Sequence, residues 1–113
     1  MAARRATVLD QIARRFQDPG LNVTDVANAL RISPRYVQRL LETSGTSFTA
    51  HVTELRLQQA LRLLAESELR ITDVAMEAGF SDVSYFNRLF RTRFGGTPRD
   101  MRAQILHKTQ TYK

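Results

Sequence analysis

The chain carries the same short pattern twice, and this repeat restricts its fold more than any other feature of the sequence. Residues 23–27, VTDVA, match residues 71–75, ITDVA, and Ser33 matches Ser81. Three further pairs match one residue later in register: Tyr36 with Tyr85, Arg39 with Arg88, and Leu40 with Leu89. Each copy predicts a short helix, a turn and a longer helix, which is the outline of a helix-turn-helix. The second copy has one extra residue at the start of its outer helix.

In the second copy, residues 71–102, caps and turns mark where helices begin and end. Thr72 is predicted to be the N-cap of the first helix, with Asp73 adding negative charge to its first turn. Gly79 is predicted to end that helix in the left-handed conformation, and Ser81-Asp82 to start the outer helix. Helical spacing places four side chains of the outer helix inside, namely Tyr85, Phe86, Leu89 and Phe90, and four outside, namely Ser84, Asn87, Arg88 and Arg91.

The first copy is preceded by an amphipathic segment, residues 6–16, that Asp18-Pro19-Gly20 ends. A second helix is expected to start at Thr24. Ser33-Pro34 then supplies a capping hydroxyl and a proline at the first position of the outer helix. That helix is expected to run to Thr43 and to bury Tyr36, Val37, Leu40 and Leu41 while exposing Arg35, Gln38, Arg39 and Glu42.

Between the copies lie residues 47–66, a stretch without Gly or Pro that predicts one helix about 30 Å long. Its apolar residues form two sets: Phe48, Val52 and Leu55, then Leu57, Ala60, Leu61 and Leu64. We expect each set to pack on one copy. Such a helix would hold the two outer helices about one turn of B-DNA apart, roughly 34 Å, so that both enter successive major grooves.

A last helix is expected after Gly95-Gly96. Thr97, Pro98 and Asp100 fit the N-cap, the first position and the third position of that helix. It is predicted to continue through Leu106.

The charge of the chain favours an anionic partner. It has 17 basic and 11 acidic residues, a net charge of +6 and a pI near 10.7. All but two of the basic residues are Arg, whose planar fork suits phosphate and guanine. A genome rich in Arg codons would give the same bias, so the charge has weight only together with the repeat. Nucleic acid is expected before a membrane, because the chain has no long apolar run.

Other classes of function are disfavoured by the residues present. The absence of cysteine excludes disulfides, thiolate metal sites and thiol nucleophiles. His51 and His107 are isolated, so no metal or other cofactor is expected. No catalytic set of carboxylates or of Ser, His and Asp can be assembled, so no enzyme is expected. The N-terminus is not a secretory signal, and a cytoplasmic, nucleoid-associated location is expected.

The run from Ala75 to Arg102, A-x3-GF-S-x3-YF-x-R-x-F-x3-FG-x-TP-x3-R, resembles the signature of the DNA-binding domain of AraC/XylS transcription regulators. Residues 30–48 and 56–64 resemble its first half. The resemblance implies an all-α fold of seven helices in a single DNA-binding domain, residues 1–113. Its expected parts are a first helix-turn-helix subdomain (6–45), a long linker helix (47–66) and a second helix-turn-helix subdomain (71–107).

The resemblance also assigns base-reading roles to seven positions of the outer helices: Arg35, Gln38, Arg39, Val83, Ser84, Asn87 and Arg88. Arg can bind guanine and Gln adenine through two hydrogen bonds, whereas Val83 offers only apolar contact and Ser84 discriminates weakly. We therefore expect the first outer helix to contribute more base specificity. Phosphate contacts are expected at Ser33, Ser81, Arg91 and Arg93.

The expected partners are double-stranded promoter DNA and, for an activator, RNA polymerase. The chain is expected to be either a small stand-alone member or the DNA-binding portion of a longer regulator with a sensor or dimerisation domain. The alternative is a helix-turn-helix kept as a protein-interaction module without sequence-specific DNA binding. That alternative predicts neutral or acidic outer helices, whereas residues 31–39 carry three Arg and no acid. For Arg39 itself, the alternative is a solvated side chain or an ion pair with Glu42.

Overall fold

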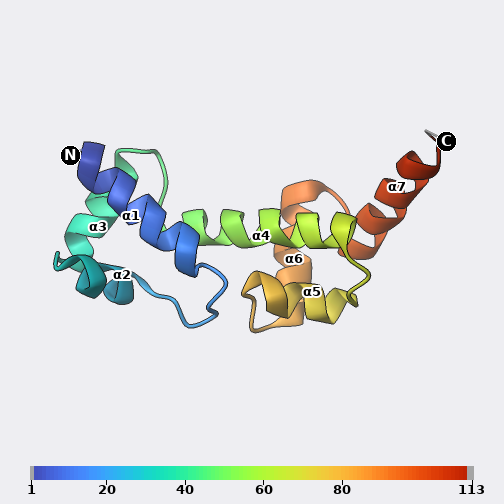
Figure 1. Cartoon of the computed structure of the whole chain (residues 1–113), viewed down its shortest axis with the longest axis horizontal. Helices are drawn as coiled ribbons and strands as arrows, with labels where there is room; N and C mark the ends of the chain where they lie inside the picture. Colours follow the sequence, from blue (N-terminus) through green and yellow to red (C-terminus); the bar gives the residue numbers. More distant parts are fainter. Residues whose placement is uncertain (1, 112–113) are drawn as a thin grey trace. The chain divides into compact units, whose positions relative to one another are not determined.

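The predicted all-α fold is confirmed. The computed structural model describes residues 2–111, and the side chains of residues 3–107. Over this range the chain forms seven α-helices and no strand (Figure 1). They are α1 (Ala2–Arg15), α2 (Val23–Leu30), α3 (Pro34–Glu42), α4 (Phe48–Glu66), α5 (Ile71–Ala78), α6 (Val83–Phe94) and α7 (Pro98–Thr111).

The chain divides into two compact units, and the boundary falls inside α4, between Leu55 and Arg56. The first unit holds α1, α2, α3 and the first part of α4, coloured blue to green in Figure 1. The second unit holds the rest of α4 with α5, α6 and α7. Each unit contains one copy of the repeat, and each has its own core.

The core of the first unit is built from all four of its helical segments. Its buried residues are Val8, Ile12, Leu21, Val26, Ala27, Val37, Leu40, Leu41, Phe48 and Val52. The outer helix α3 has nine residues, too few for a stable helix alone. Its three buried side chains each stabilise the fold by roughly 1.5–3 kcal/mol. Packing on this core therefore holds α3 in place while its other face stays polar.

The core of the second unit has an aromatic centre. Its buried residues are Leu57, Ala60, Leu64, Val74, Ala75, Ala78, Phe80, Phe86 and Phe90. Ring centroids along the row Phe80, Phe86, Phe90 and Phe94 are 5.0, 5.6 and 4.7 Å apart. The two apolar sets of α4 thus divide between the two cores, in agreement with the prediction from their spacing.

Tyr85 lies outside this core, and the prediction that it is buried is wrong. Its side chain is 40% exposed, whereas Phe86 and Phe90 are fully buried. Phe86 and Phe90 mark the centre of the buried face of α6, and Tyr85 lies about 100° away around the helix. A tyrosine is stable at such an edge because its hydroxyl keeps contact with water.

Thr72 is not an N-cap, which also corrects the prediction. In the first copy Asn22 caps α2, since its side chain accepts a hydrogen bond from the Asp25 N–H at 2.9 Å. The equivalent residue in the second copy is Arg70, whose side chain makes no capping bond. Thr72 lies one residue inside α5, because the helix already includes Ile71, which packs half-buried on the second core.

The extra residue of the second copy lies in its turn. Both first helices end with a left-handed residue, Arg31 at φ 57° and Gly79 at φ 107°. The N-cap of the outer helix follows at Ser33 in the first copy and at Asp82 in the second. The structural counterpart of Ser33 is therefore Asp82, and the pairing of Ser33 with Ser81 is wrong. A carboxylate caps a helix as well as a hydroxyl does, so the insertion of Ser81 leaves α6 capped.

The remaining ends follow the expected chemistry, with longer terminal helices. α1 begins at Ala2 and α7 continues to Thr111, beyond the predicted limits of 6 and 106. The Thr97 hydroxyl accepts from the Asp100 N–H at 3.1 Å, and the Asp100 carboxylate accepts from the Thr97 N–H at 3.4 Å. No helix within residues 2–111 is long and apolar enough to cross a membrane.

Candidate nucleic-acid interface

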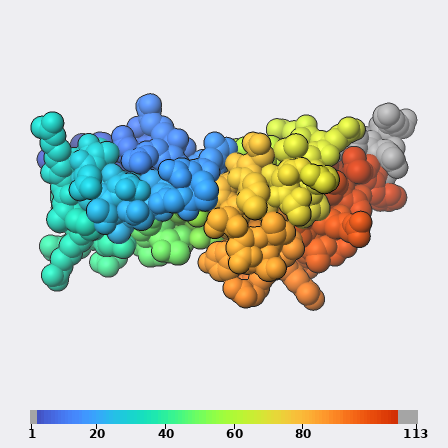
Figure 2. Space-filling model, turned by 90° about the horizontal axis from the view of Figure 1, so that it is seen from below, coloured from blue at the N-terminus to red at the C-terminus, as the bar shows by residue number. Residues whose placement is uncertain are grey.

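The outer face of α3 presents two unpaired guanidinium groups. Arg35 and Arg39 are exposed, and neither side chain makes a hydrogen bond or an ion pair within the described part of the chain. The ion pair with Glu42 considered for Arg39 does not form. No carboxylate occurs in the sequence between Asp25 and Glu42. Figure 2 shows long side chains of this segment, coloured cyan to turquoise, projecting from the surface of the first unit. α3 therefore offers free positive charge to an external anion.

Ser33 and Gln38, also predicted to contact DNA, have partners inside the first unit. The Ser33 hydroxyl accepts from the Tyr36 N–H at 3.1 Å, so it caps α3. Gln38 is half-buried, and its Oε1 accepts from the Phe48 N–H at the start of α4, at 3.4 Å. The Gln38 Oε1 thus has a partner within the unit, and a bidentate contact with adenine needs this oxygen as well as the Nε2 group.

The outer face of α6 carries the second group of predicted contacts. Ser84, Asn87, Arg88 and Arg91 are exposed, as their spacing predicts. Val83 is half-buried and packs against the core of the second unit, so little of its side chain is free for a thymine methyl. Arg93 is exposed, with its guanidinium 4.9 Å from the centroid of the Phe94 ring. Ser81 is exposed in the turn before the helix.

A contact between Tyr85 and Arg88 was missed by the sequence reasoning. The Arg88 guanidinium lies over the Tyr85 ring, 5.3 Å from its centroid. An exposed cation–π contact of this kind stabilises by about 0.5–1 kcal/mol and restricts the arginine side chain. The sequence did contain a signal, namely Tyr rather than Phe at position 85. A buried tyrosine needs a partner for its hydroxyl, so a tyrosine here favours an exposed position.

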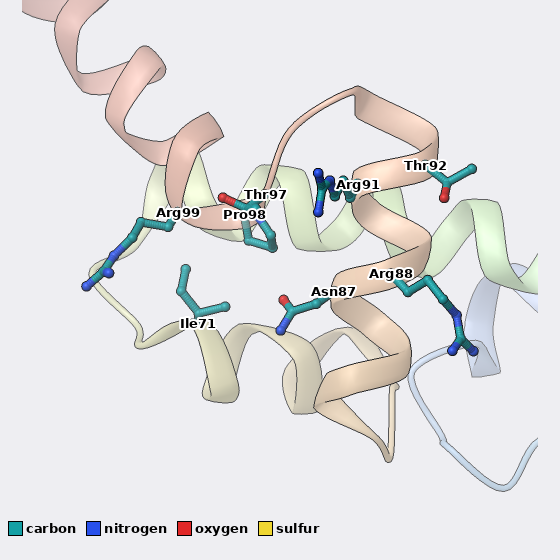
Figure 3. A pocket seen from close by; sticks show the side chains of 8 residues that line it. All are labelled: Ile71, Asn87, Arg88, Arg91, Thr92, Thr97, Pro98 and Arg99. Atoms are coloured by element: carbon teal, nitrogen blue, oxygen red, sulfur yellow. The ribbon is translucent and has the colours of Figure 1, made fainter.

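One side of α6 borders an open groove of about 600 Å³ within the second unit (Figure 3). Eight residues line it: Ile71, Asn87, Arg88, Arg91, Thr92, Thr97, Pro98 and Arg99. Figure 3 shows Asn87 and Arg91 directed from α6 toward the starts of α5 and α7. Arg88 extends from the other side of α6. The groove therefore lies along the side of α6 that carries Asn87 and Arg91, and not along the side from which Arg88 extends.

Some arginines of the chain serve the fold, and Arg102 is the clearest case. Its guanidinium donates to the carbonyl oxygens of Leu64 at 3.2 Å, Ser67 at 3.2 Å and Leu69 at 2.6 Å. These oxygens lie at the end of α4 and in the segment that follows, so Arg102 ties α7 to them. Sequence reasoning identified Arg102 only as the last position of a family pattern, because its three partners lie at least 33 residues away.

One histidine of the chain has a perturbed pKa. Burial lowers the pKa of His51, on α4, below its ordinary value of 6.5. Among the residues that the structure describes, no group of three His, Asp or Glu side chains could hold a metal ion.

Sequence comparisons place the chain beside known regulators. A family model described as a helix-turn-helix domain matches residues 26–104. The chain is 41% identical over 101 residues to the transcriptional activator RhrA of Rhizobium meliloti (strain 1021), covering 88% of this chain and 32% of RhrA. It is 36% identical over 102 residues to the HTH-type transcriptional activator RhaS of Escherichia coli, covering 89% of this chain and 36% of RhaS. The chain spans about a third of the length of these curated relatives.

The fold is shared with solved structures. The C-terminal domain of AraT, a response regulator from Geobacillus stearothermophilus, superposes with a TM-score of 0.84 at 29% sequence identity. The match covers 88% of this chain and 84% of that one. The seven helices and their order are therefore those of a known architecture.

Proposed function

Because the chain belongs to the AraC/XylS family of helix-turn-helix transcription regulators, we propose that it binds a specific double-stranded promoter site by placing α3 and α6 in successive major grooves. The observation that carries the proposal is the free guanidinium pair on α3, Arg35 and Arg39. Two exposed, unpaired arginines on one face of a nine-residue helix suit guanine O6 and N7. α4, with 19 residues, contributes to the cores of both units, one of which holds α3 and the other α6.

The base readers of this proposal are those expected from the sequence: Arg35, Gln38, Arg39, Val83, Ser84, Asn87 and Arg88. α3 contributes most of the specificity, since it holds two free arginines. α6 contributes less, because Val83 is half-buried and Arg88 is already stacked on Tyr85. Ser33, Ser81, Arg91 and Arg93 contact phosphates, which supply affinity without sequence preference.

The consequence for transcription rests on the relatives. RhrA and RhaS are named as activators, so we propose activation by way of RNA polymerase, in the cytoplasm at the nucleoid. Both relatives are about three times as long as the part that matches. We propose that a sensor or dimerisation domain accompanies this domain in a longer regulator. We assign no enzymatic activity to it.

The test is selection of bound sites from a pool of random duplexes. Two half-motifs about one helical turn apart, recovered with the wild-type chain, support bipartite reading. Arg39→Ala should relax the consensus in one half-motif and Arg88→Ala in the other. A pool without enrichment, or binding that does not weaken with salt, would favour the protein-interaction module instead, because neutralising phosphates releases counterions.

A further inference from the structure

The groove beside α6 is bordered by arginines and by no acidic residue. Its eight lining residues include three arginines and no carboxylate, and the side chains of Arg91 and Arg99 border it, whereas that of Arg88 extends from the other side of α6 (Figure 3). The side chains of Arg91 and Arg99 are exposed and make no hydrogen bond or ion pair within the described residues. Both guanidinium groups are therefore available to an anion that enters the groove.

The nearest acids in the sequence are engaged at the starts of their own helices. The Asp73 carboxylate accepts from the Arg70 Nε at 3.3 Å, at the start of α5. The Asp100 carboxylate accepts from the Thr97 N–H at 3.4 Å, at the start of α7. Neither lines the groove, so its positive charge is available to a molecule from outside.

Arg91 and Arg99 come from different helices, and two apolar residues of the groove, Ile71 and Pro98, form its floor. Figure 3 shows Arg91 on α6 and Arg99 at the start of α7, with Ile71 and Pro98 between them. Pro98 is fully buried and Ile71 half-buried, so both form a fixed surface. An open hollow with guanidinium groups at its sides and an apolar floor suits one unit of a sugar–phosphate chain, whose charge meets the arginines and whose sugar meets the floor.

We propose that this groove seats a backbone phosphodiester of the DNA strand that flanks α6, with Arg99 as a phosphate contact beside Arg91. The proposal rests on the proposed function, since it requires α6 to enter a major groove. A helix in the major groove has a phosphate backbone on each side. The groove lies along the edge of α6 that carries Asn87 and Arg91, where one of these backbones would run. α7 thereby becomes part of the DNA-binding surface.

The test compares Arg99→Gln and Arg91→Gln with Arg62→Gln. Arg62 is exposed on α4 in the same unit and does not line the groove, so its loss controls for net charge. Relative to this control, Arg99→Gln should weaken binding about fivefold, as loss of an exposed ion pair does. The loss should be equal for the selected site and for unrelated duplexes. The slope of log K against log salt should become shallower by about 0.9.

A chemical cycle locates the contact. Duplexes carrying a single uncharged methylphosphonate are scanned across the backbone beside the second half-motif. At one position, the methylphosphonate should weaken binding by the wild-type chain as much as Arg99→Gln does. The same methylphosphonate should not weaken binding by the Arg99→Gln chain any further. Equal behaviour of Arg99→Gln and Arg62→Gln would overturn the proposal, and so would additive losses at every methylphosphonate position.

The same measurements separate this proposal from the proposed function. If the wild-type chain binds no duplex, the function itself fails. If it binds its site and the groove variants match the control, only the groove proposal fails. Free phosphate is the other possible source of the anion. Titration of inorganic phosphate should leave the Arg99 side-chain NMR signal unchanged at millimolar concentration, and saturation well below that would overturn the assignment to DNA.

Discussion

Arg31 shows at the scale of one residue how the two copies differ. It is the only non-glycine residue with positive φ in the described part of the chain, whereas its counterpart is Gly79. An L-residue in this conformation costs roughly 1–2 kcal/mol relative to glycine. The exposed Arg31 side chain makes no hydrogen bond or ion pair within the described residues that would offset this cost.

Arg31→Gly should therefore raise the free energy of unfolding by about 1 kcal/mol. Urea denaturation followed by circular dichroism measures the change. The matched control is Gly79→Ala, which should lower stability, because φ 107° strains any side chain. A loss of stability in Arg31→Gly would mean that the side chain has a structural role that its exposure does not indicate.

Arg102, unlike Arg31, has a side chain that stabilises the fold, because it donates hydrogen bonds to three carbonyl oxygens. Arg102→Gln should lower the free energy of unfolding by about 2 kcal/mol, because several charge-assisted hydrogen bonds are lost at once. Arg99→Gln, an exposed change on the same helix, should stay within about 0.5 kcal/mol of the wild type. Equal stabilities of the two variants in denaturant would refute the structural role of Arg102.

His51 makes stability depend on pH. Its pKa in the folded chain lies below the ordinary value of 6.5, because burial disfavours the charged ring. The unfolded chain therefore takes up a proton at this site at higher pH than the folded chain does. The stabilisation is complete above about pH 6.5 and is lost as the pH falls toward the folded pKa. His51→Gln should remove this component, so that the wild type loses stability relative to the variant as the pH falls from about 7.5 to about 5.

At the scale of elements, α3 and α6 occupy equivalent places in the two copies of the repeat, but we expect α3 to contribute more to base specificity. Arg39→Ala should cost about 1–3 kcal/mol of binding free energy and relax one base position if its contact is bidentate. Arg88→Ala should cost less, because stacking on Tyr85 holds the guanidinium to one side. Fluorescence anisotropy on the selected site and on single-base variants measures both. Unchanged affinity in both variants would contradict reading by the two outer helices.

The same elements show how far sequence reasoning reaches. The repeat and the helical spacing predicted the order of helices, the left-handed Gly79 and the two apolar sets of α4. They did not place the extra residue, because Ser81 and Asp82 are both good caps and only the geometry of the turn selects between them. They also did not show the groove, because Arg99 and Arg91 belong to helices joined by a turn whose path is not encoded in periodicity. The roles of the predicted base readers remain predictions.

At the scale of the whole molecule, charge governs association. The chain carries a net charge of +6, and among the described residues the exposed Arg35, Arg39, Arg88 and Arg91 of the two outer helices have no carboxylate partner. The logarithm of the affinity for DNA should fall linearly with the logarithm of salt concentration, with a slope of about −0.9 for each phosphate neutralised. Measurement between 50 and 300 mM salt, roughly the range over which this dependence is read, tests the prediction. A flat line would show that the contacts are not with phosphates.

The boundary between the two units inside α4 limits how such a molecule can be recombined. A gene fusion that exchanges one reader for another usually joins its parents in a loop, yet here the boundary between Leu55 and Arg56 is helical. Each parent must contribute its own part of α4, because Phe48 and Val52 complete one core and Leu57, Ala60 and Leu64 the other. A chimera joined within this helix, without insertion or deletion, keeps both cores. In a chimera joined in the segment after Glu66, the incoming helices α5–α7 would pack on the α4 residues of the other parent.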